Sequence, residues 1–425
     1  MKQPPLITPR EVDVPRAQRH TFPNGASLYA IPSDDFEVLR FTFVFRAGSS
    51  MQHTPFAASA TANMLSEGSR DMTARQIAER LDFYGSYFEV NVDRDYVYIS
   101  FSSLSKFFGP TLEVAEQILL QPLFPEDELR AYCEKRKQTL TIERRKVDTV
   151  GREIFAEALF GDKHPYGISY PEKDYDTLTR ADLESLYRRL YTAENCLVVC
   201  SGRIGEEELQ GIGALAEKLP RADRSATADF PAPRSEAYRF VERPDAVQSS
   251  LRVGRLLFTR THPDFVGMQV VATVLGGYFG SRLMQNLRGE HGYTYGVGAA
   301  MVNFEREGYL GIAAQVGAEV TAPALREIYN EIERLRREPM PEEELSLVKN
   351  IMTGEVMRIL DGPFGIADVT IENLLCGTNN GVIEENIRRI QAITPAEVQR
   401  LAVKYLRRED LITAVVGAVD PFTKL

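Results

Sequence analysis

One segment divides the chain into two halves that repeat a single order of strands and helices. Between Leu219 and Arg234 the composition shifts to Pro, Ala, Asp, Arg and Ser, which is typical of a linker between domains. The 425 residues also exceed what one hydrophobic core usually holds. We therefore predict an α+β protein with domains over 1–219 and 235–425, joined by a linker over 220–234.

Alternating apolar runs in the first half predict strands, and helical periodicity predicts the helices between them. The segment 164–167, His-Pro-Tyr-Gly, predicts a turn because Pro and Gly both interrupt regular structure. Strands are expected at 26–31, 38–45, 86–101 and 197–200, and helices at 56–65, 73–83, 107–119, 125–160 and 180–190.

The same order of elements begins again after the linker. Strands are expected at 238–241, 249–258 and 411–416, with a strand pair over 295–316 and helices at 263–275, 282–288, 321–359, 383–393 and 395–405. Duplication of one plan is the simplest explanation of this order.

The charge pattern argues against nucleic acid and membrane partners. The net charge is −10, and basic residues are interleaved with acidic ones, so binding of nucleic acid through counterion release is not expected. No stretch approaches the ~20 apolar residues of a membrane-spanning helix. The N-terminal residues also lack the apolar core of a signal peptide, which predicts a cytoplasmic protein.

The four cysteines, Cys133, Cys196, Cys200 and Cys376, form no Cys-x-x-Cys pair. Cys196 and Cys200 lie in one apolar run, on the same face of an expected strand. Buried free thiols are a better interpretation than a zinc knot or a disulfide.

Five motifs occur in a fixed order along nearly the whole chain, at residues 45–49 (FRAGS), 64–69 (MLSEGS), 159–167 (LFGDKHPYG), 275–283 (LGGYFGSRL) and 287–295 (LRGEHGYTY). They resemble the pitrilysin/insulinase family of zinc peptidases, in particular its short two-domain members related to mitochondrial processing peptidase subunits. The resemblance implies two similar domains, each a mostly antiparallel sheet packed with helices.

Members of that family that cut peptides carry His-x-x-Glu-His on the first helix, and a later helix adds a Glu. Two histidines four residues apart share one helical face and can bind Zn²⁺, while the Glu between them activates water. The resemblance places this motif at 59–63, which reads Ser-Ala-Thr-Ala-Asn, and the later Glu near Leu140 or Thr141. Every ligand is replaced, so no zinc is expected on this chain.

The histidines offer no substitute metal site. No two of them stand at a short ligand spacing; they are His20, His53, His164, His262 and His291. His53 is expected to be a loop residue, and His164 and His262, each before a proline, are expected to be structural.

Arg288 and Tyr295 match the arginine and tyrosine that, in the family, reach the zinc site of the first domain or of a partner chain. The resemblance implies that they bind the peptide and stabilise the oxyanion, a task that suits a guanidinium and a phenol. From spacing alone, a surface arginine near a helix end and an ordinary strand tyrosine would be the better interpretation. Tyr293 competes with Tyr295 if the strand has already begun.

The glycines Gly276, Gly277 and Gly280 do not form a phosphate-binding loop, because no Lys-Ser/Thr follows them. Close backbone packing, or a mobile loop beside a peptide-binding cavity, explains them better.

The leading hypothesis is a non-catalytic subunit that lends Arg288 and Tyr295 to a zinc-bearing homologous peptidase subunit acting on peptides. One alternative is a proteolytically inactive structural or peptide-binding homologue that resembles the core subunits of respiratory complexes. Another is a homodimer that binds peptides without cutting them.

Overall fold

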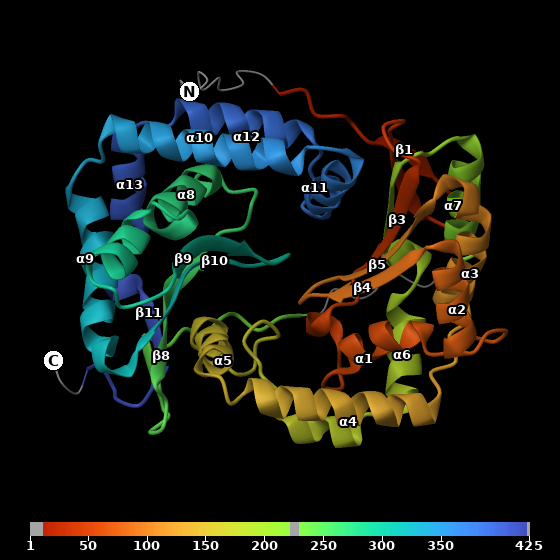
Figure 1. The fold of residues 1–425 in the computed structure, drawn as a ribbon, viewed down its shortest axis with the longest axis horizontal. Helices are drawn as coiled ribbons and strands as arrows, with labels where there is room; N and C mark the ends of the chain where they lie inside the picture. The colour runs from red at the N-terminus through yellow and green to blue at the C-terminus, as the bar shows by residue number, and fades with distance from the viewer. Residues whose placement is uncertain (1–11, 222–228, 423–425) are drawn as a thin grey trace.

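Two sheets, each packed with helices, build the protein. The computed structural model describes residues 12–221 and 229–422, so part of the predicted linker, 222–228, lies outside the described residues. Figure 1 shows the half that carries the first sheet on the right and the half that carries the second sheet on the left.

The two sheets share one topology. The first has the order β1-β2-β6-β3-β5-β4 and the second β7-β11-β8-β10-β9. Only the pairs β2–β6 and β7–β11 are parallel. The strands of the first sheet are β1 (Gln18–Thr21), β2 (Ser27–Pro32), β3 (Val38–Phe45), β4 (Tyr87–Val92), β5 (Val97–Leu104) and β6 (Cys196–Gly202). Those of the second are β7 (Tyr238–Glu242), β8 (Gln248–Leu257), β9 (Val297–Asn303), β10 (Gly308–Gly317) and β11 (Ile412–Gly417). Because β2, β6, β3, β5 and β4 correspond in order to β7, β11, β8, β10 and β9, the repeated plan is present in the fold.

Thirteen α-helices lie within the described residues. In the first half these are α1 (Ala57–Asn63), α2 (Ala74–Tyr84), α3 (Phe108–Leu120), α4 (Glu126–Glu143), α5 (Val147–Phe160), α6 (Arg180–Leu190) and α7 (Glu206–Glu217). In the second half they are α8 (Phe265–Ala272), α9 (Thr321–Arg337), α10 (Glu342–Ile359), α11 (Pro363–Leu375), α12 (Gly381–Ala392) and α13 (Pro395–Tyr405). The predicted elements are present, but β1, α7 and α11 were not predicted.

Two of the predicted elements are each divided into two in the structure. The strand expected at 86–101 is the hairpin β4–β5, because the Asp93 carboxylate accepts hydrogen bonds from the backbone N–H groups of Asp95 and Tyr96 at 2.7 and 2.6 Å and closes a turn. The helix expected at 125–160 breaks between α4 and α5. The backbone becomes extended at Lys146, and the Arg144 side chain before it binds the carboxylates of Glu153 and Glu172.

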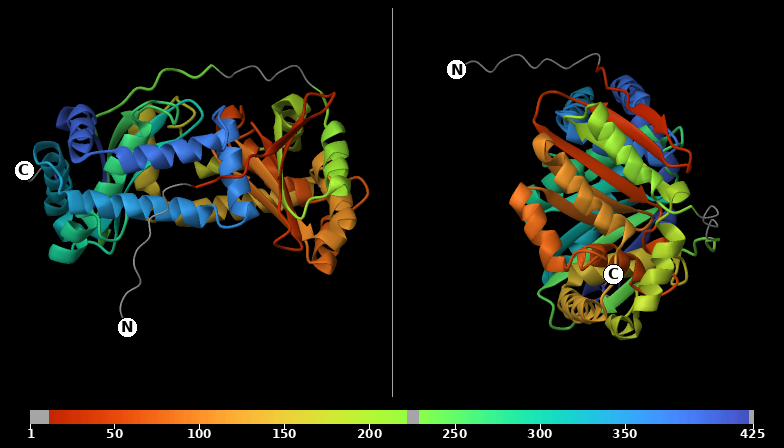
Figure 2. Two further views of the ribbon diagram at one scale, coloured as in Figure 1. Left: turned by 90° about the horizontal axis from the view of Figure 1, so that it is seen from above. Right: turned by 90° about the vertical axis from the view of Figure 1, so that its right-hand side faces the viewer.

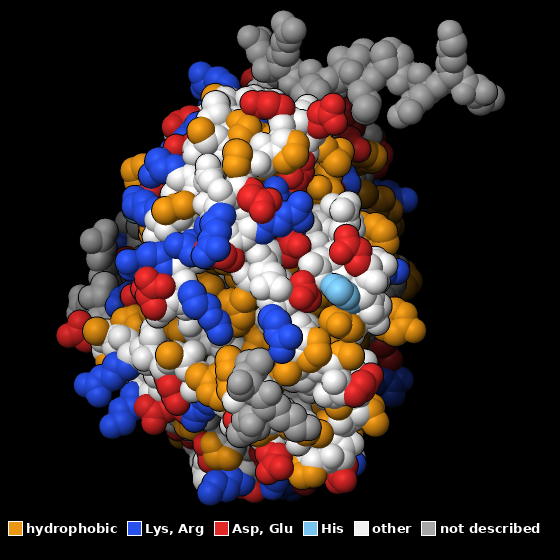
Figure 3. All heavy atoms as spheres, turned by 90° about the vertical axis from the view of Figure 1, so that its left-hand side faces the viewer, with side chains coloured by type: hydrophobic (Ala, Val, Ile, Leu, Met, Phe, Trp, Pro, Cys, Tyr) orange, Lys and Arg blue, Asp and Glu red, His pale blue; other side chains and the backbone are white. Residues whose placement is uncertain are grey.

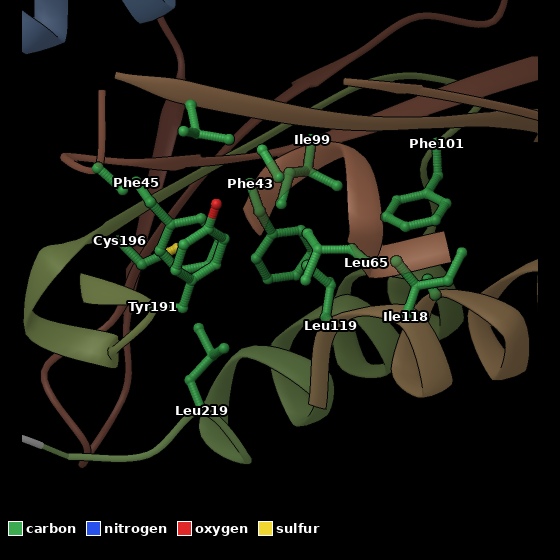
Figure 4. Packing of buried hydrophobic residues seen from close by; sticks show 14 of the residues in the cluster. Phe43, Phe45, Leu65, Ile99, Phe101, Ile118, Leu119, Tyr191, Cys196 and Leu219 are labelled. Atoms are coloured by element: carbon green, nitrogen blue, oxygen red, sulfur yellow. The ribbon is translucent and has the colours of Figure 1, made fainter. Parts of the chain in front are cut away.

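The first core lies between its sheet and the helices α1, α3, α6 and α7. Figure 4 shows how Phe43 and Phe45 of β3 meet Tyr191 and Cys196 in this core. Cys196 and Cys200 are buried free thiols, as predicted. Burial raises the pKa of Cys200 to about 12, so this thiol stays protonated.

Each half lends one helix to the sheet of the other half. Helix α5 packs Ile154 and Phe155 against Ile412 and Val416 of β11. Gly151 makes this approach close, since an added Cβ would lie 2.4 Å from the Ser250 hydroxyl oxygen. In the opposite direction, α11 covers the outer face of β2 and β6, at the end of helices that Figure 2 shows running toward the first half. The two halves are therefore interlocked.

The corresponding hairpins of the two halves meet at their tips. The backbone N–H of Glu305, between β9 and β10, donates to the Asp95 carboxylate at 2.7 Å. The Glu305 side chain pairs with Arg46 at 2.9 Å, and Phe304 stacks on Tyr166 with ring centroids 4.4 Å apart. Figure 1 shows both hairpins reaching toward the centre of the molecule.

The outer surface of the second half has mixed charge. Figure 3 shows basic and acidic side chains side by side on this face. Helices α9 and α13 each carry ion pairs, such as Arg336–Glu333 and Arg400–Glu397. Across 12–221 and 229–422, none of the helices has the combined length and apolar composition that crossing a bilayer demands.

Candidate functional site

The first half-site surrounds α1, where the sequence places the lost zinc motif. Ser59 donates to the Phe56 carbonyl at 3.1 Å, and the Asn63 amide donates to the Ser59 carbonyl at 2.7 Å. Both side chains therefore satisfy backbone carbonyls of their own helix. Ala62, at the position of the catalytic Glu, is fully buried in the core.

Helix α4 supplies an aromatic ring and a cation beside Ser59. The Tyr132 hydroxyl interacts with Ser59 and with the Arg136 guanidinium, although neither contact has the geometry of a full hydrogen bond. Burial raises the pKa of Tyr132 to about 12. Arg136 also binds Tyr175, whose ring stacks on Phe56 with centroids 3.9 Å apart.

The position of the family's later Glu was predicted at Leu140 or Thr141. Tyr132 of α4 interacts with Ser59, and Arg136 lies beside Tyr132, one helical turn later and about one turn before the predicted position. The position of the later Glu therefore stays a prediction.

Zinc does not fit this half-site. Ser59 interacts with the Tyr132 phenol, and the Arg136 guanidinium lies beside that phenol; a guanidinium cannot bind a metal ion because it stays protonated. Within residues 12–221 and 229–422, no three His, Cys, Asp or Glu side chains lie close enough together to hold a metal.

His164 and His262 have structural contacts. The Nδ1 atom of each accepts a backbone N–H two residues later, from Tyr166 at 3.1 Å and from Asp264 at 3.0 Å. His262 also stacks on Phe258. His53 is exposed in the loop before α1.

Arg288 lies on the surface of the second half, in the helical turn η7 (Met284–Glu290). Its guanidinium carbon lies 4.6 Å from the ring centroid of Phe279, which is itself 72% exposed. A cation over an exposed ring is held in place without losing its capacity to donate hydrogen bonds. Phe279 was not singled out in the sequence analysis, because no pattern there distinguishes it from other aromatic residues.

Tyr295 and Tyr293 occupy different environments. Tyr295 is 91% exposed, whereas Tyr293 is half-buried against the second core and stacks on His291 with centroids 4.9 Å apart. The strand β9 begins only at Val297, so strand alternation does not place the two tyrosines on one face. Only Tyr295 has a side chain open to a ligand.

The segment between Arg288 and Tyr295 is closed by backbone hydrogen bonds. The N–H of Tyr293 donates to the Leu287 carbonyl at 2.7 Å, and Gly292 between them takes a φ of +66°, which favours glycine. The Thr294 hydroxyl donates to the carbonyls of Gln315 and Gly296. These bonds hold Tyr295 at the start of β9, on the same surface segment as Arg288.

Of the glycines before η7, Gly276 packs closely against the backbone of β9. A Cβ added to Gly276 would lie 2.5 Å from the backbone nitrogen of Ala299. Gly276 and Gly277 also line a cavity between the two halves.

Comparison with known proteins shows which family this chain resembles. The family model that describes the peptidase M16 inactive domain matches residues 177–352, a range that contains Arg288 and Tyr295. This match, together with relatives that are named zinc proteases and a processing peptidase subunit, confirms the resemblance to pitrilysin/insulinase-type peptidases. The zinc motif of those peptidases is missing at residues 59–63.

Several relatives of this chain show how far the similarity extends. An uncharacterized zinc protease of Mycobacterium tuberculosis is 28% identical over 266 residues, which cover 60% of this chain and 60% of that protein. A probable mitochondrial-processing peptidase subunit beta of Arabidopsis thaliana is 21% identical over 429 residues, covering 96% of this chain and 80% of the relative. The crystal structure of a peptidase M16 inactive domain from Pseudomonas fluorescens has a TM-score of 0.86 at 23% identity, over 95% of this chain and 98% of that chain. This structural likeness confirms the fold.

Proposed function

We propose that this chain is the non-catalytic subunit of a two-chain zinc peptidase. Arg288 and Tyr295 bind the peptide substrate and stabilise the oxyanion of the scissile carbonyl, and a homologous partner subunit carries the zinc. The chain alone cuts no peptide.

The contrast between the two half-sites carries this proposal. Around α1, Ser59 and Asn63 donate hydrogen bonds to backbone carbonyls of their own helix. Tyr132 and Arg136 occupy the space beside Ser59, so no room for a metal ion is kept at the position of the lost motif. In the second half, Tyr295 is fully open and Arg288 keeps its guanidinium on the surface. A chain that had lost all peptidase chemistry would have no need to hold both groups open on one surface segment.

The chemistry of the pair suits charge that develops on a carbonyl oxygen. The Arg288 guanidinium keeps its charge at every physiological pH and presents several donors in a fixed plane. The Tyr295 hydroxyl adds one neutral donor. Donors of this kind stabilise an oxyanion more than the ground-state carbonyl, so they accelerate the reaction step itself.

The relatives support a two-chain peptidase with peptides as its substrates. The Mycobacterium tuberculosis relative is named a zinc protease, and the Arabidopsis thaliana relative is named as one subunit of a processing peptidase. A chain without the motif therefore fits best beside a homologue that has it.

Reconstitution tests this proposal. The purified chain is mixed with a homologue of similar length that retains His-x-x-Glu-His, and the complex is measured by size-exclusion chromatography with light scattering. Cleavage of an internally quenched peptide is followed in parallel. A 1:1 complex whose activity exceeds that of either chain alone supports the proposal. Stable separation of the two chains, with no stimulation, contradicts it.

The filled zinc position also favours a second candidate, an inactive structural or peptide-binding homologue. Under this alternative the chain would bind a partner that is not a peptidase, and Arg288 and Tyr295 would have no effect on catalysis. The reconstitution separates the two candidates, because only the first requires activity from the mixed pair.

A further inference from the structure

A cavity of about 780 Å³ lies between the two halves, beside the meeting hairpins. Its walls come from helix α5, from the turn between β4 and β5, and from strands β9 and β10. Pockets of a few hundred to a thousand cubic ångströms commonly hold small ligands or the end of a peptide. Neither Arg288 nor Tyr295 lines this cavity, so it is a separate site.

The cavity has an excess of positive charge. Arg94, Arg152 and Arg252 line it, against a single acid, Glu153. Glu153 is paired with Arg144 through two contacts of 3.1 Å. A ligand therefore meets guanidinium groups whose charge Glu153 does not balance.

Arg152 and Arg252 share one carboxylate outside the cavity. Arg252 pairs with Asp148, and Arg152 lies 3.7 Å from the same side chain. The Nε atom of Arg252 is buried and has no hydrogen-bond partner among the described residues. The Asp148 carboxylate therefore neutralises only one of two positive charges, and the Nε–H of Arg252 remains free to donate to a ligand.

Arg94 is the strongest indication of an anion site. Its side chain is half-buried, and within residues 12–221 and 229–422 no ion pair or hydrogen bond of its guanidinium is found. Burial lowers its pKa, and the neighbouring Tyr170, Tyr309, Asp95 and Glu153 oppose this effect. A half-buried guanidinium without a hydrogen-bonded partner gains from a ligand that supplies the counter-charge.

The turn that carries Arg94 is rigid. The carbonyl groups of Asp93, Arg94 and Asp95 accept backbone N–H groups from the loop after β3, at 3.1, 2.7 and 3.0 Å. That loop contains Gly48, where an added Cβ would lie 2.5 Å from the Asp95 backbone. The backbone from which the Arg94 side chain extends is therefore held in place before any ligand arrives, which limits the entropy lost on binding.

The floor of the cavity is flat and apolar. Gly298 and Ala300 of β9 and Gly311 and Ala313 of β10 present little or no side chain. A Cβ added to Gly298 would meet no atom within 4 Å, so open space lies above this position. Aromatic rings complete the walls, from Phe155, Phe160, Phe304 and Tyr309. Such a surface accepts a peptide backbone with small or apolar side chains.

We propose that this cavity binds the carboxylate of a peptide, with Arg94 as its principal partner and Arg252 as the second. The inference rests on the proposed function only in taking peptides as the ligand. Guanidinium groups bind carboxylates through paired hydrogen bonds, and the apolar floor favours a peptide over a free inorganic anion. The carboxylate comes from the C-terminus or from an acidic side chain.

The position of the cavity relates it to Tyr295. Ala300 follows Tyr295 by five residues, and five extended residues span at most about 18 Å. A peptide held at Tyr295 would therefore reach the cavity with roughly five residues. This relation predicts a carboxylate at a set distance from the peptide bond that Tyr295 contacts.

Equilibrium binding to the full chain tests the proposal. The probe is an N-terminally fluorescein-labelled octapeptide of Ala, Gly and Leu, made with a free C-terminus, with an amidated C-terminus, and amidated with one internal Glu. Binding by the free acid at least about tenfold tighter than by the amide, with the difference lost in Arg94→Gln, is expected. Equally tight binding by the Glu peptide would also support the site and would identify a side-chain carboxylate as sufficient.

Two controls keep the result interpretable. Arg358→Gln removes an exposed arginine of α10 far from the cavity lining and is expected to leave binding unchanged. The unfolding temperature of Arg94→Gln is expected to stay the same or rise, because a half-buried charge without a hydrogen-bonded partner is removed. A marked fall would assign Arg94 a role in folding and overturn the proposal.

Other outcomes also decide the question. Equal affinities of acid and amide would overturn the carboxylate site, as would inorganic phosphate that displaces both equally. Failure of the proposed function gives a different pattern. Discrimination between acid and amide would then persist in the isolated chain, while no zinc-bearing partner is stimulated.

Discussion

The Asp95 carboxylate accepts the backbone N–H of Glu305 at 2.7 Å and so joins the two halves at the tips of corresponding hairpins. The same carboxylate accepts the hydroxyls of Tyr166 at 2.7 Å and Ser50 at 3.1 Å. It is buried, and three donors depend on it.

Asp95→Ala is expected to destabilise the protein by about 3 kcal/mol, because buried donors lose their acceptor. Urea unfolding measures this difference. Asp176→Ala, which removes an exposed partner of Lys137, is the control and is expected to cost less than about 1 kcal/mol. An equal loss of unfolding free energy in the two variants would show that the hairpin contact contributes no more to stability than an exposed ion pair.

The exchange of α5 and α11 predicts that damage in one half is transmitted to the other. Phe155→Ala leaves a cavity between α5 and the second sheet and should cost about 3–5 kcal/mol. Hydrogen exchange should then show loss of protection in β8 and β11, although the substitution lies in the first half of the sequence. Phe83→Ala, on an exposed ring of α2, should stay within about 0.5 kcal/mol of the parent. Loss of protection confined to the first sheet would contradict the interlocked arrangement.

The surroundings of Ser59 predict that restoring two histidines does not restore a zinc site. Ser59→His with Asn63→His is expected to bind Zn²⁺ weakly, because the positive charge of Arg136 stands next to Tyr132, the side chain that interacts with Ser59. Adding Arg136→Glu removes that charge and supplies a carboxylate, so the affinity should rise by at least about tenfold. Calorimetric titration with Zn²⁺ measures both variants.

The matched control adds Arg130→Glu, on an exposed position of the same helix, to the two histidines. It should leave zinc affinity near that of the double variant. Tight binding by the double variant itself would show that Tyr132 and Arg136 do not obstruct the site.

His164 predicts a loss of stability as the pH falls from 7 to 5. Burial lowers the pKa of His164 below its ordinary value of about 6.5, and its Nδ1 must stay unprotonated to accept the N–H of Tyr166. The unfolded state takes up a proton near pH 6.5 while the folded state does not, so protonation favours unfolding.

His164→Asn keeps an acceptor and removes the titration, so the free energy of unfolding should depend less on pH over this range. His53→Asn changes an exposed histidine and should leave the pH dependence as in the parent. An unchanged slope in His164→Asn would assign the pH dependence to other groups.

Local pattern was enough to predict most of the fold, because apolar alternation and helical periodicity are set by which face each residue buries. The strand β3 and the helix α6 have the predicted bounds. The division at Asp93 was missed, although an Asp that caps its own turn is a signal that sequence can carry.

The contents of the two half-sites could be predicted less well. The loss of zinc ligands at 59–63 can be seen directly in the sequence, and the motif at 287–295 is enough to single out Arg288 and Tyr295. The approach of Tyr132 and Arg136 to Ser59 depends on how α4 packs, and the unpaired charge of Arg94 depends on contacts between the halves. Neither feature produces an apolar periodicity or a motif that could be recognised in the sequence.

The turnover number of the reconstituted pair shows whether Arg288 and Tyr295 take part in catalysis. Each of Arg288→Ala and Tyr295→Phe, introduced into this chain alone, is expected to lower kcat by about 10²–10³, as loss of an oxyanion donor does, while complex formation is unchanged. Tyr293→Phe is the matched control and should retain the parent kcat, since that ring packs against the core. An unchanged kcat in both Arg288→Ala and Tyr295→Phe would contradict the account.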